Sequence, residues 1–359
     1  MRIYFIGAGF ISRTHMDSLR KLGLYESTQV RICDSNPKTL EDFIDLHPGA
    51  VGFSDAKHML SEDPQKDDVV IVGTPPSSHF TLAMLGLKSG RHVLCEKPLV
   101  TKSADADLLF KEAQQRGLTI GCCSSRFAGL EMAKVVRDIL QQGRIGAPYK
   151  FSFIHRVNRG RPGIEYQPHS KWFLDSSVSG GGILFDWGPY DIASLIELLE
   201  PERVEVHGAW LSRPITDVDP TDVVNDVETH CGAMMKFIQK NGDDVFIQYE
   251  RASCTHGNTF NQVELEGTLG AITWDSFYGG EEITLSTDVE GKIHQEKEVV
   301  TAKDEFSPMD NPVRWFVSHL ENGQSPAIVN EQAVFNLHCL QAIYQGARTG
   351  EIQIVERVK

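Results

Sequence analysis

The sequence predicts an α/β protein with two domains, and three observations support that fold class. The chain has 359 residues, which is more than one hydrophobic core usually serves. Through the first third of the chain, short β-rich runs alternate with helical stretches, a spacing typical of βαβ units in a parallel sheet. Beyond residue 125 long alternating runs appear instead, and they predict an antiparallel sheet with one covered face and one open face.

The composition excludes several classes of partner. The chain carries 35 Lys and Arg residues against 49 Asp and Glu residues, a formal net charge of -14, which disfavours nucleic acid and anionic membranes. No apolar run approaches the length of a membrane span, and the N-terminus leads directly into a glycine loop, so we expect a cytoplasmic protein. The seven cysteines show neither a C-x-x-C pair nor Cys/His ligand spacing, so we expect free thiols and no metal.

A glycine-rich loop follows the first β-rich run, which covers residues 2–6. Residues 7–12 match the pattern G-x-G-x-x-S, and an amphipathic helical stretch comes after them. Gly7 allows a tight turn and Gly9 lets the backbone approach a pyrophosphate, while Ser12 stands where a slightly smaller third residue is usual. The strand, the loop and the helix together predict dinucleotide binding by Gly7, Gly9, Phe10 and Ile11.

An acidic residue ends the second strand, which is predicted over residues 30–33. The carboxylate of Asp34 can accept hydrogen bonds from both ribose hydroxyls of an adenosine and would repel a 2′-phosphate. It therefore predicts NAD in preference to NADP. A second interpretation, compatible with the first, makes Asp34 part of a capping turn for a helix over 38–46.

A third loop follows the β-branched run over residues 68–72, which is typical of a strand buried on both faces. It contains Thr74 and Pro75, and His79 stands near the start of the next helix. We expect these three residues near the cofactor. His79 alone is equally consistent with a helix-start residue that has no chemical role.

The run over residues 91–95 predicts a strand that delivers Glu96, Lys97 and Pro98 at its end. Ligands bind at the carboxyl ends of strands in open α/β sheets, so Lys97 is expected to point into a cleft. The alternative is a solvated Glu96–Lys97 pair in a surface loop.

These motifs together resemble the Gfo/Idh/MocA family, which includes glucose-fructose oxidoreductase and inositol dehydrogenase. The resemblance implies an N-terminal Rossmann domain over 1–125 and a C-terminal α/β domain over 126–359 with a large, mostly antiparallel, open-faced sheet. It implies NAD-dependent transfer of a hydride at a secondary hydroxyl of a sugar, sugar derivative or polyol. It also suggests a homodimer or homotetramer formed through the open face of that sheet, and a last helix that packs back on the first domain. The matching segments are 7–12, Asp34, 73–79, 90–98, Arg126, 143–146, 179–182 and 186–188.

A second chemical constellation surrounds the glycines at 180–182, which let the backbone pass close to a ligand. Asp186 and Tyr190 are four residues apart, so one continuous helix would place them on the same face. Relatives commonly have His where this chain has Tyr190 and an Asp three residues later. Here that later position is Ala193 and an Asp stands at 191, while glucose-fructose oxidoreductases themselves carry Tyr at the position of Tyr190.

Oxidation of a secondary alcohol needs a base within hydrogen-bond reach of the hydroxyl. Tyrosine has a reference pKa of about 10 and serves as a base only beside a cation, for which Lys97 is the expected source, with Asp186 orienting the pair. The alternative for Tyr190 is a half-buried packing residue. The expected catalytic residues are Lys97, Asp186 and Tyr190; the expected cofactor contacts are Gly7, Gly9, Phe10, Ile11, Asp34, Thr74, Pro75, His79, Glu96, Lys97 and Arg126; the expected substrate contacts are Lys97, Arg126, His155, Arg156, Asn158, Lys171, Trp172, Asp186, Tyr190 and Asp191.

Three functions fit these residues. The first is an NAD-dependent sugar or polyol dehydrogenase, which the retention of Lys97 and Asp186 favours. The second, which the resemblance implies because the family includes a dinucleotide-binding transcriptional corepressor, is an NAD-binding regulatory protein without turnover. The third is an NAD-dependent glycoside hydrolase, in which transient oxidation helps to break the glycosidic bond.

Overall fold

The computed structural model describes residues 1–25, 30–158, 170–214, 224–276, 278–301 and 305–357. The chain divides into two compact units. The first comprises Met1–Arg126 and Glu305–Leu337, and the second comprises Phe127–Asp304 and His338–Lys359.

The first unit contains a seven-stranded sheet made of β1 (Ile3–Ile6), β2 (Val30–Cys33), β3 (Val51–Phe53), β4 (Val69–Val72), β5 (His92–Cys95), β6 (Ile120–Cys122) and β15 (Ile328–Val329). The strands are ordered β15-β6-β5-β4-β1-β2-β3, and all neighbours are parallel except β15 and β6. All four residues of β1 and of β4 are buried, because helices cover both faces of the sheet. The predicted parallel sheet is therefore confirmed.

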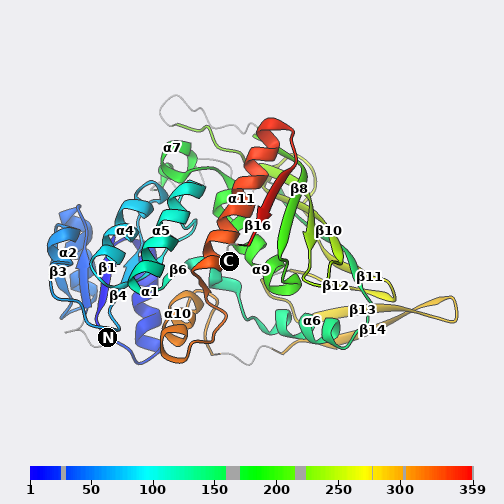
Figure 1. Ribbon diagram of the computed structural model, residues 1–359, viewed down its shortest axis with the longest axis horizontal. Helices are drawn as coiled ribbons and strands as arrows, with labels where there is room; N and C mark the ends of the chain where they lie inside the picture. The colour runs from blue at the N-terminus through cyan, green and yellow to red at the C-terminus, as the bar shows by residue number, and fades with distance from the viewer. Residues whose placement is uncertain (26–29, 159–169, 215–223, 277, 302–304, 358–359) are drawn as a thin grey trace. The chain divides into compact units, whose positions relative to one another are not determined.

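Two groups of helices cover this sheet. On one face α1 (Phe10–Lys21), α2 (Pro37–Leu46) and α10 (Asn311–Asn322) share a buried core with the strands. On the other face α4 (His79–Lys88) packs beside α5 (Ser103–Arg116) and against β4 and β5 (Figure 1). The short helix α3 (Ala56–Met59) follows β3, and the 3-10 helices η2 (Pro76–Ser78) and η3 (Cys123–Phe127) follow β4 and β6.

Residues 305–337 group with the first unit, whereas the sequence analysis places them in the second domain. Strand β15 extends the first sheet by pairing Ile328 with Cys122 of β6. The side chain of Phe316 in α10 packs so closely on Gly121 that a Cβ at that position would lie 2.6 Å from its ring. The backbone of β6 therefore provides both the hydrogen-bonding edge and the packing surface that hold this segment.

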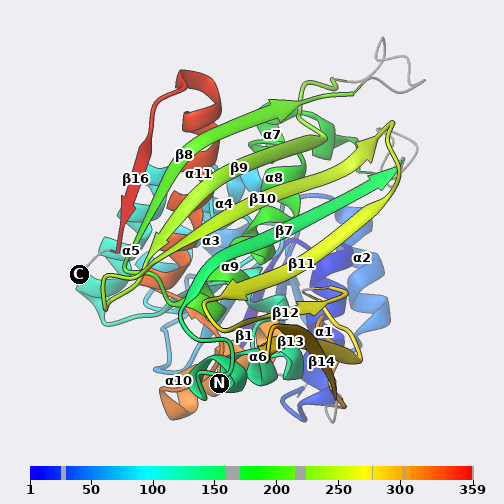
Figure 2. The same ribbon diagram turned by 90° about the vertical axis from the view of Figure 1, so that its right-hand side faces the viewer.

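The second unit contains a nine-stranded sheet made of β7 (Pro148–Asn158), β8 (Arg203–Ser212), β9 (His230–Ile238), β10 (Asp244–Thr255), β11 (Phe260–Gly267), β12 (Gly270–Trp274), β13 (Glu282–Val289), β14 (Lys292–Val299) and β16 (Gln353–Glu356). The order is β14-β13-β12-β11-β7-β10-β9-β8-β16, as Figure 2 shows. Only the β7–β10 pair is parallel among these described strands. The expectation of a large, mostly antiparallel sheet is confirmed.

The strands of this sheet alternate between a covered face and an open face. In β10, Val245, Ile247, Tyr249 and Arg251 are buried, while Phe246 between them is 51% exposed. Helices of this unit are α6 (Glu131–Gln141), α7 (Ser176–Ser179), α8 (Ile183–Asp186) and α9 (Gly188–Leu199), with the 3-10 helix η5 (Lys171–Leu174). Helix α11 (Glu331–Thr349) begins in the first unit and ends in the second, and its residues up to Leu337 group with the first.

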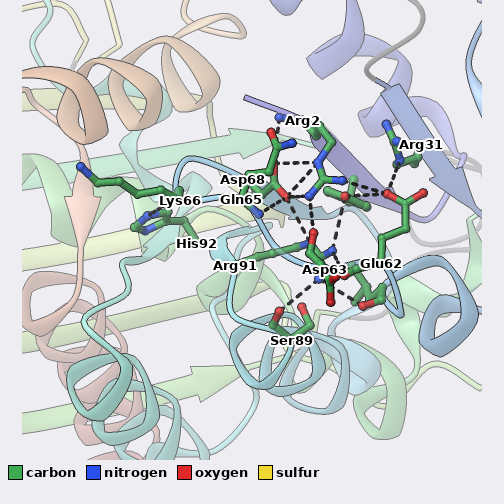
Figure 3. Close-up of polar contacts among 12 residues, drawn as sticks. Arg2, Arg31, Glu62, Asp63, Gln65, Lys66, Asp68, Ser89, Arg91 and His92 are labelled. Carbon is green, nitrogen blue, oxygen red and sulfur yellow. Dashed lines mark hydrogen bonds and ion pairs between the residues drawn. The ribbon is translucent and has the colours of Figure 1, made fainter.

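A buried network of charged side chains lies at the amino ends of β1, β4 and β5 (Figure 3). The Asp68 carboxylate accepts hydrogen bonds from the Arg2 guanidinium, the shortest of them 2.6 Å long. Arg91 is fully buried, donates to three backbone carbonyl oxygens, and lies with its guanidinium carbon 4.4 Å from the ring centre of Tyr4. The Glu62 carboxylate forms a second ion pair with Arg2, at 3.1 Å. Ion pairs between side chains and hydrogen bonds to backbone carbonyl oxygens therefore stabilise this amino edge of the sheet.

No helix within the described residues is long and apolar enough to cross a membrane.

Candidate active site

The glycine loop connects β1 to α1 at the carboxyl edge of the first sheet. Gly7 has a φ of +97°, and a Cβ there would lie 2.6 Å from the carbonyl oxygen of Gly73, so only glycine fits. Gly9 is the N-cap of α1 and supplies no side-chain hydrogen bond to the helix. A Cβ at Gly9 would meet no atom within 4 Å. The start of α1 therefore has no side-chain cap and room beside Gly9, features that suit the binding of a pyrophosphate.

Ser12, which replaces the usual third glycine, is accommodated by a second glycine. A Cβ at Gly73 would lie 2.4 Å from the Ser12 hydroxyl oxygen, so the hydroxyl occupies the space that a side chain at 73 would need. Ser12 is fully buried, and its Oγ has no hydrogen-bond partner among the described residues. The hydroxyl is enclosed by protein atoms, so it fills the space between α1 and the loop that begins at Gly73.

Asp34, at the end of β2, contacts the glycine loop directly. Its Oδ2 accepts a hydrogen bond of 2.8 Å from the Ala8 N–H, and its Oδ1 accepts one of 2.8 Å from the Asn36 N–H. Asn36 is the N-cap of α2, so Asp34 holds the capping turn of this helix as well as the glycine loop, and the two interpretations of Asp34 are compatible. Each carboxylate oxygen keeps a lone pair that can accept a ribose hydroxyl.

His79 joins two loops of the carboxyl edge. Its Nε2 lies 2.7 Å from the carbonyl oxygen of Thr74, and its Nδ1 lies 2.8 Å from that of Pro98, which follows Lys97 through a cis peptide bond. Burial lowers the pKa of His79, although both carbonyl oxygens favour the protonated ring. His79 thus holds Thr74 beside the loop that bears Lys97, and its contact with the cofactor stays a prediction. Pro75 and Phe10 are exposed and Ile11 is half-buried.

Glu96 is the centre of a buried polar cluster. Its Oε1 lies 2.9 Å from Nε2 of His15 and 3.8 Å from Nη2 of Arg126, and its Oε2 accepts a hydrogen bond of 3.0 Å from the Lys97 N–H. Burial raises the pKa of Glu96, but the hydrogen bond with His15 and the charges of Arg126 and Lys97 outweigh it and hold the pKa well below its ordinary value. Glu96 is therefore a carboxylate that organises the loop, and Lys97 beside it is half-buried.

In the second unit, Asp186 and Tyr190 lie on different helices, so the shared face that one continuous helix would give them does not apply. Helix α8 ends at Asp186, and α9 begins at Gly188 with a proline in its first turn. Tyr190 is 2% exposed, and its ring makes edge contacts with Phe127 and Trp187, at centroid distances of 5.2 and 5.9 Å. Tyr190 is thus packed among aromatic rings and is buried more deeply than the half-buried residue of the alternative interpretation. Its role in catalysis stays a prediction.

Asp191 is fully buried against residues that the sequence analysis does not single out. Its Oδ2 accepts hydrogen bonds of 2.9 Å from Nε of Arg251 and from the Tyr249 hydroxyl, and its Oδ1 contacts Arg251 and Tyr278. The Arg251 guanidinium lies 5.1 Å from the Trp187 ring centre. The Asp191 carboxylate therefore holds the Arg251 guanidinium, which in turn packs on the Trp187 ring.

The remaining predicted substrate residues lie on strand β7 and on the 3-10 helix η5. His155 is paired with Arg251 across neighbouring strands, and burial followed by the charge of Arg251 lowers its pKa. Arg156 follows His155 in β7 and so lies on the opposite face of the sheet, where it is 3.7 Å from Glu250. Its contact with a substrate stays a prediction. Asn158 donates to the Gly257 carbonyl at the exposed end of β7, Lys171 is exposed, and Trp172 stacks on Phe173 at 3.9 Å.

Comparison with known proteins decides the family. A model of the oxidoreductase family with an NAD-binding Rossmann fold, Gfo/Idh/MocA, matches residues 1–122. A model of the Gfo/Idh/MocA C-terminal domain matches residues 133–273. The chain belongs to the Gfo/Idh/MocA family.

Relatives of this Gfo/Idh/MocA protein include enzymes with established names. It is 24% identical over 303 residues to 1,5-anhydro-D-fructose reductase of Ensifer adhaerens, a match that covers 80% of each chain. It is 22% identical over 287 residues to D-xylose 1-dehydrogenase [NADP(+)] of Haloarcula marismortui, covering 79% of this chain and 73% of that one. Its fold matches levoglucosan dehydrogenase in complex with NADH, with a TM-score of 0.78, 18% identity and full coverage of both chains.

Membership in the Gfo/Idh/MocA family confirms the predicted resemblance, the fold class, the class of oxidoreductase and NAD as the cofactor. The residues of the first unit fit that cofactor, because the uncapped start of α1 and the Asp34 carboxylate each offer groups that a dinucleotide can bind. His15 and Arg251 are the charged or polar residues that sequence reasoning missed. Each occupies a buried position in an amphipathic pattern, where a polar residue is itself a signal.

Proposed function

We propose that this protein is an NAD-dependent dehydrogenase that acts on a secondary hydroxyl of a sugar, sugar derivative or polyol. The observation that carries the proposal is Lys97, held beside the carboxyl end of β5 by Glu96 and at the same sheet edge as the glycine loop. The named substrates of the relatives, anhydrofructose, xylose and levoglucosan, support a carbohydrate substrate. Bound NAD supplies a carbon that accepts or returns a hydride.

In the first unit, the start of α1 would hold the pyrophosphate and Asp34 the adenosine ribose, with Phe10, Ile11, Thr74 and Pro75 lining the cofactor. The ammonium group of Lys97 would hold the substrate hydroxyl and stabilise the charge that develops as its proton leaves. Arg126 lies beside Glu96 and would contact the cofactor or the substrate. Lys97 is thus proposed as a catalytic residue.

In the second unit, we propose Asp186 and Tyr190 as the residues that act on the substrate. Two roles are open for Tyr190. As the proton carrier its hydroxyl would exchange a proton with the substrate, so Tyr190→Phe would lower kcat and remove the basic limb of the pH profile. If instead Lys97 carries the proton and Tyr190 only binds the substrate, the same change would mainly raise KM. His155, Lys171 and Trp172 are proposed as substrate contacts, and Asp191 as a residue that supports them through Arg251.

The decisive experiment is a thermal-shift screen of neutral sugars, polyols and sugar phosphates with NAD present, followed by spectroscopic assay of each hit. Accumulation of NADH with an alcohol substrate would support the dehydrogenase. Release of a free sugar from a glycoside without net NADH would show the glycoside hydrolase instead. Tight NAD binding with no turnover on any hit would favour the regulatory protein.

We also propose that the protein is a cytoplasmic homodimer or homotetramer. The free cysteines, all seven of them buried thiols, and the NAD cofactor support the location. The open face of the second sheet supports self-association, because large apolar side chains are exposed there at Trp210, Met234, Phe246, Phe260 and Ile354. Sedimentation of the wild type and of Phe246→Glu tests this, since a charge on the face would dissociate the oligomer, and a monomeric wild type would contradict it.

A further inference from the structure

Helix α1 contains a buried histidine that belongs to none of the cofactor motifs. His15 is fully buried, and its Nε2 lies 2.9 Å from Oε1 of Glu96, a residue 81 positions away in the chain. Its Nδ1 is buried and has no hydrogen-bond partner among the residues that the structure describes. All of the hydrogen bonding of this ring within the described chain is thus directed at Glu96 and the neighbouring thiol of Cys123, 3.8 Å from Nε2.

The ionisation of Glu96 fixes the direction of this hydrogen bond. Burial raises the pKa of Glu96, but the hydrogen bond with His15 and the charges of Arg126 and Lys97 lower it by more. The carboxyl group is therefore ionised and can only accept hydrogen bonds. Nε2 of His15 must therefore carry the proton and donate it. A proton donor at this position of α1 holds one oxygen of Glu96.

The second oxygen of Glu96 holds the backbone of Lys97. Oε2 accepts the Lys97 N–H at 3.0 Å, so the carboxylate bridges the imidazole of α1 and the backbone that carries the Lys97 side chain. On the other side of Lys97, the carbonyl oxygen of Pro98 is bonded to His79. Lys97 is therefore held between two buried histidines, one before it through Glu96 and one after it through Pro98.

We propose that His15 is a positioning residue for Lys97 that acts through Glu96. Without the imidazole, Oε1 keeps its ion pair with Arg126, at 3.8 Å. The carboxylate would turn toward that cation, and the Lys97 N–H would lose its acceptor. A small displacement of a reacting group is costly, since a shift of about 1 Å can lower a rate roughly 10²-fold. The inference rests on the proposed catalytic role of Lys97.

The same atoms raise a different possibility, a metal site. Ligand atoms of His15, Glu96 and Cys123 all lie within 4.8 Å of one another and are buried. Two features disfavour a cation there. The positive charge of Arg126 lies beside Glu96, and burial raises the pKa of the Cys123 thiol well above its ordinary value, so the thiolate that a metal needs is disfavoured. A hydrogen-bonded positioning group fits these charges better.

The test compares His15→Leu, His15→Gln and Ser18→Ala with the wild type. His15→Leu removes the donor, whereas the Gln amide can donate from nearly the position of Nε2. Ser18→Ala is the matched control, because Ser18 is also buried on α1 and donates a hydrogen bond of 2.8 Å to a different carboxylate, that of Asp310. We expect His15→Leu to lower kcat roughly 10- to 10²-fold with little change in KM or in the Kd of NADH. His15→Gln should recover most of the turnover, and Ser18→Ala should lower Tm without lowering kcat.

A second measurement needs no turnover and so separates this inference from the proposed function. Reductive ¹³C-methylation labels the lysines, and the Lys97 signal, assigned by its loss in Lys97→Met, should shift in His15→Leu and stay in place in Ser18→Ala. Normal kcat and an unmoved Lys97 signal in His15→Leu would overturn the proposal. Equal losses of kcat in His15→Leu and Ser18→Ala would overturn it as well, as would a stoichiometric metal ion that His15→Leu releases. A wild type that reduces no NAD, combined with a shifted Lys97 signal, would reject the proposed function alone.

Discussion

The amino and carboxyl edges of the first sheet use charged residues in opposite ways. At the amino edge Asp68 is bonded to Arg2, and Arg91 donates to backbone carbonyls, so the charges are satisfied by protein groups. At the carboxyl edge Glu96 is equally buried and equally ionised, but it bonds to the backbone of a half-buried lysine. The uncapped α1 and the unbonded Ser12 hydroxyl lie at this edge too.

The comparison indicates that charged residues at the amino edge stabilise the fold, whereas those at the carboxyl edge position groups for a ligand. The Asp68 carboxylate bonds to groups at the amino edge, away from the predicted site, so we expect it to affect only the stability of the fold. The Glu96 carboxylate holds the backbone of Lys97 and so sets where the Lys97 side chain lies. We therefore expect its main effect to be on turnover. Substitutions at the two edges should therefore separate into changes of stability and changes of activity.

The largest expected effect is on stability, at the amino edge. Asp68→Asn removes the negative charge between Arg2 and Arg91 and leaves both cations partly uncompensated in a buried site. We expect the free energy of unfolding to fall by about 3–5 kcal/mol, with kcat per folded molecule unchanged. Urea denaturation measures the first and the NADH assay the second. The control is Asp42→Asn, which breaks the exposed pair with Lys38 and should change stability little; equal effects of the two changes would contradict the interpretation.

At the carboxyl edge, Lys97→Met should do the reverse. We expect turnover to fall by roughly 10²-fold or more, the scale of a positioned acid-base group, while the Kd of NADH and the free energy of unfolding stay close to those of the wild type. Lys102→Met, five residues later and exposed, is the matched control. If Lys97→Met kept normal turnover on the identified substrate, Lys97 would be structural only.

Acid should weaken the amino edge in a defined pH range. Burial raises the pKa of Asp68, but the hydrogen bonds from Arg2 and from the Gln65 N–H lower it below its ordinary value. A carboxyl group with a depressed pKa contributes stability that is fully present above its unfolded pKa, about 3.9, and is lost as the pH falls through the folded value. The difference in stability between wild type and Asp68→Asn should therefore be greatest above about pH 5 and shrink below about pH 4. A difference independent of pH in urea titrations would show that geometry rather than charge matters.

Much of the carboxyl edge follows from local sequence. Gly7, Gly9 and Asp34 each stand where a strand turns into a helix, and the strand order alone brings their loops to one edge. His15 escaped detection because its partner Glu96 is 81 residues away, and Arg251 because Asp191 is 60 residues away. Pairings over such distances depend on how helices pack on sheets.

Some of the missed features did leave a signal in the sequence. Arg251 is two residues after the buried Tyr249 and four after the buried Ile247, so it lies on the same face of the strand. That spacing predicts a charged side chain on the covered face. Pro189 indicates the break between α8 and α9, since proline favours the first turn of a helix. The return of residues 305–337 to the first unit has no such local mark, because an amphipathic helix does not specify which sheet it covers.

A smaller effect is expected where Ser12 meets Gly73. Gly73→Ala would place a methyl group 2.4 Å from the Ser12 Oγ, and overpacking of this kind costs about 1–3 kcal/mol. Ser12→Gly should relieve the clash, so the double variant should be more stable than Gly73→Ala alone. Thermal denaturation of the four proteins measures this coupling. Additive effects of the two changes would show that the hydroxyl does not fill that space.

The smallest expected effect concerns the choice of cofactor at Asp34. Its carboxylate has two functions, since Oδ2 holds the Ala8 N–H of the glycine loop and the negative charge would repel the 2′-phosphate of NADP. Asp34→Asn keeps an oxygen that can accept the loop N–H but removes the charge, so it should narrow the preference for NAD while preserving NAD affinity. Asp34→Ala removes both, so the preference should narrow and the affinity for both cofactors should fall. Fluorescence titration of the wild type and both variants with NADH and NADPH gives the six dissociation constants. Equal binding of the two cofactors by the wild type would contradict the role of the charge, and unchanged affinity in Asp34→Ala would contradict the role of the hydrogen bond to Ala8.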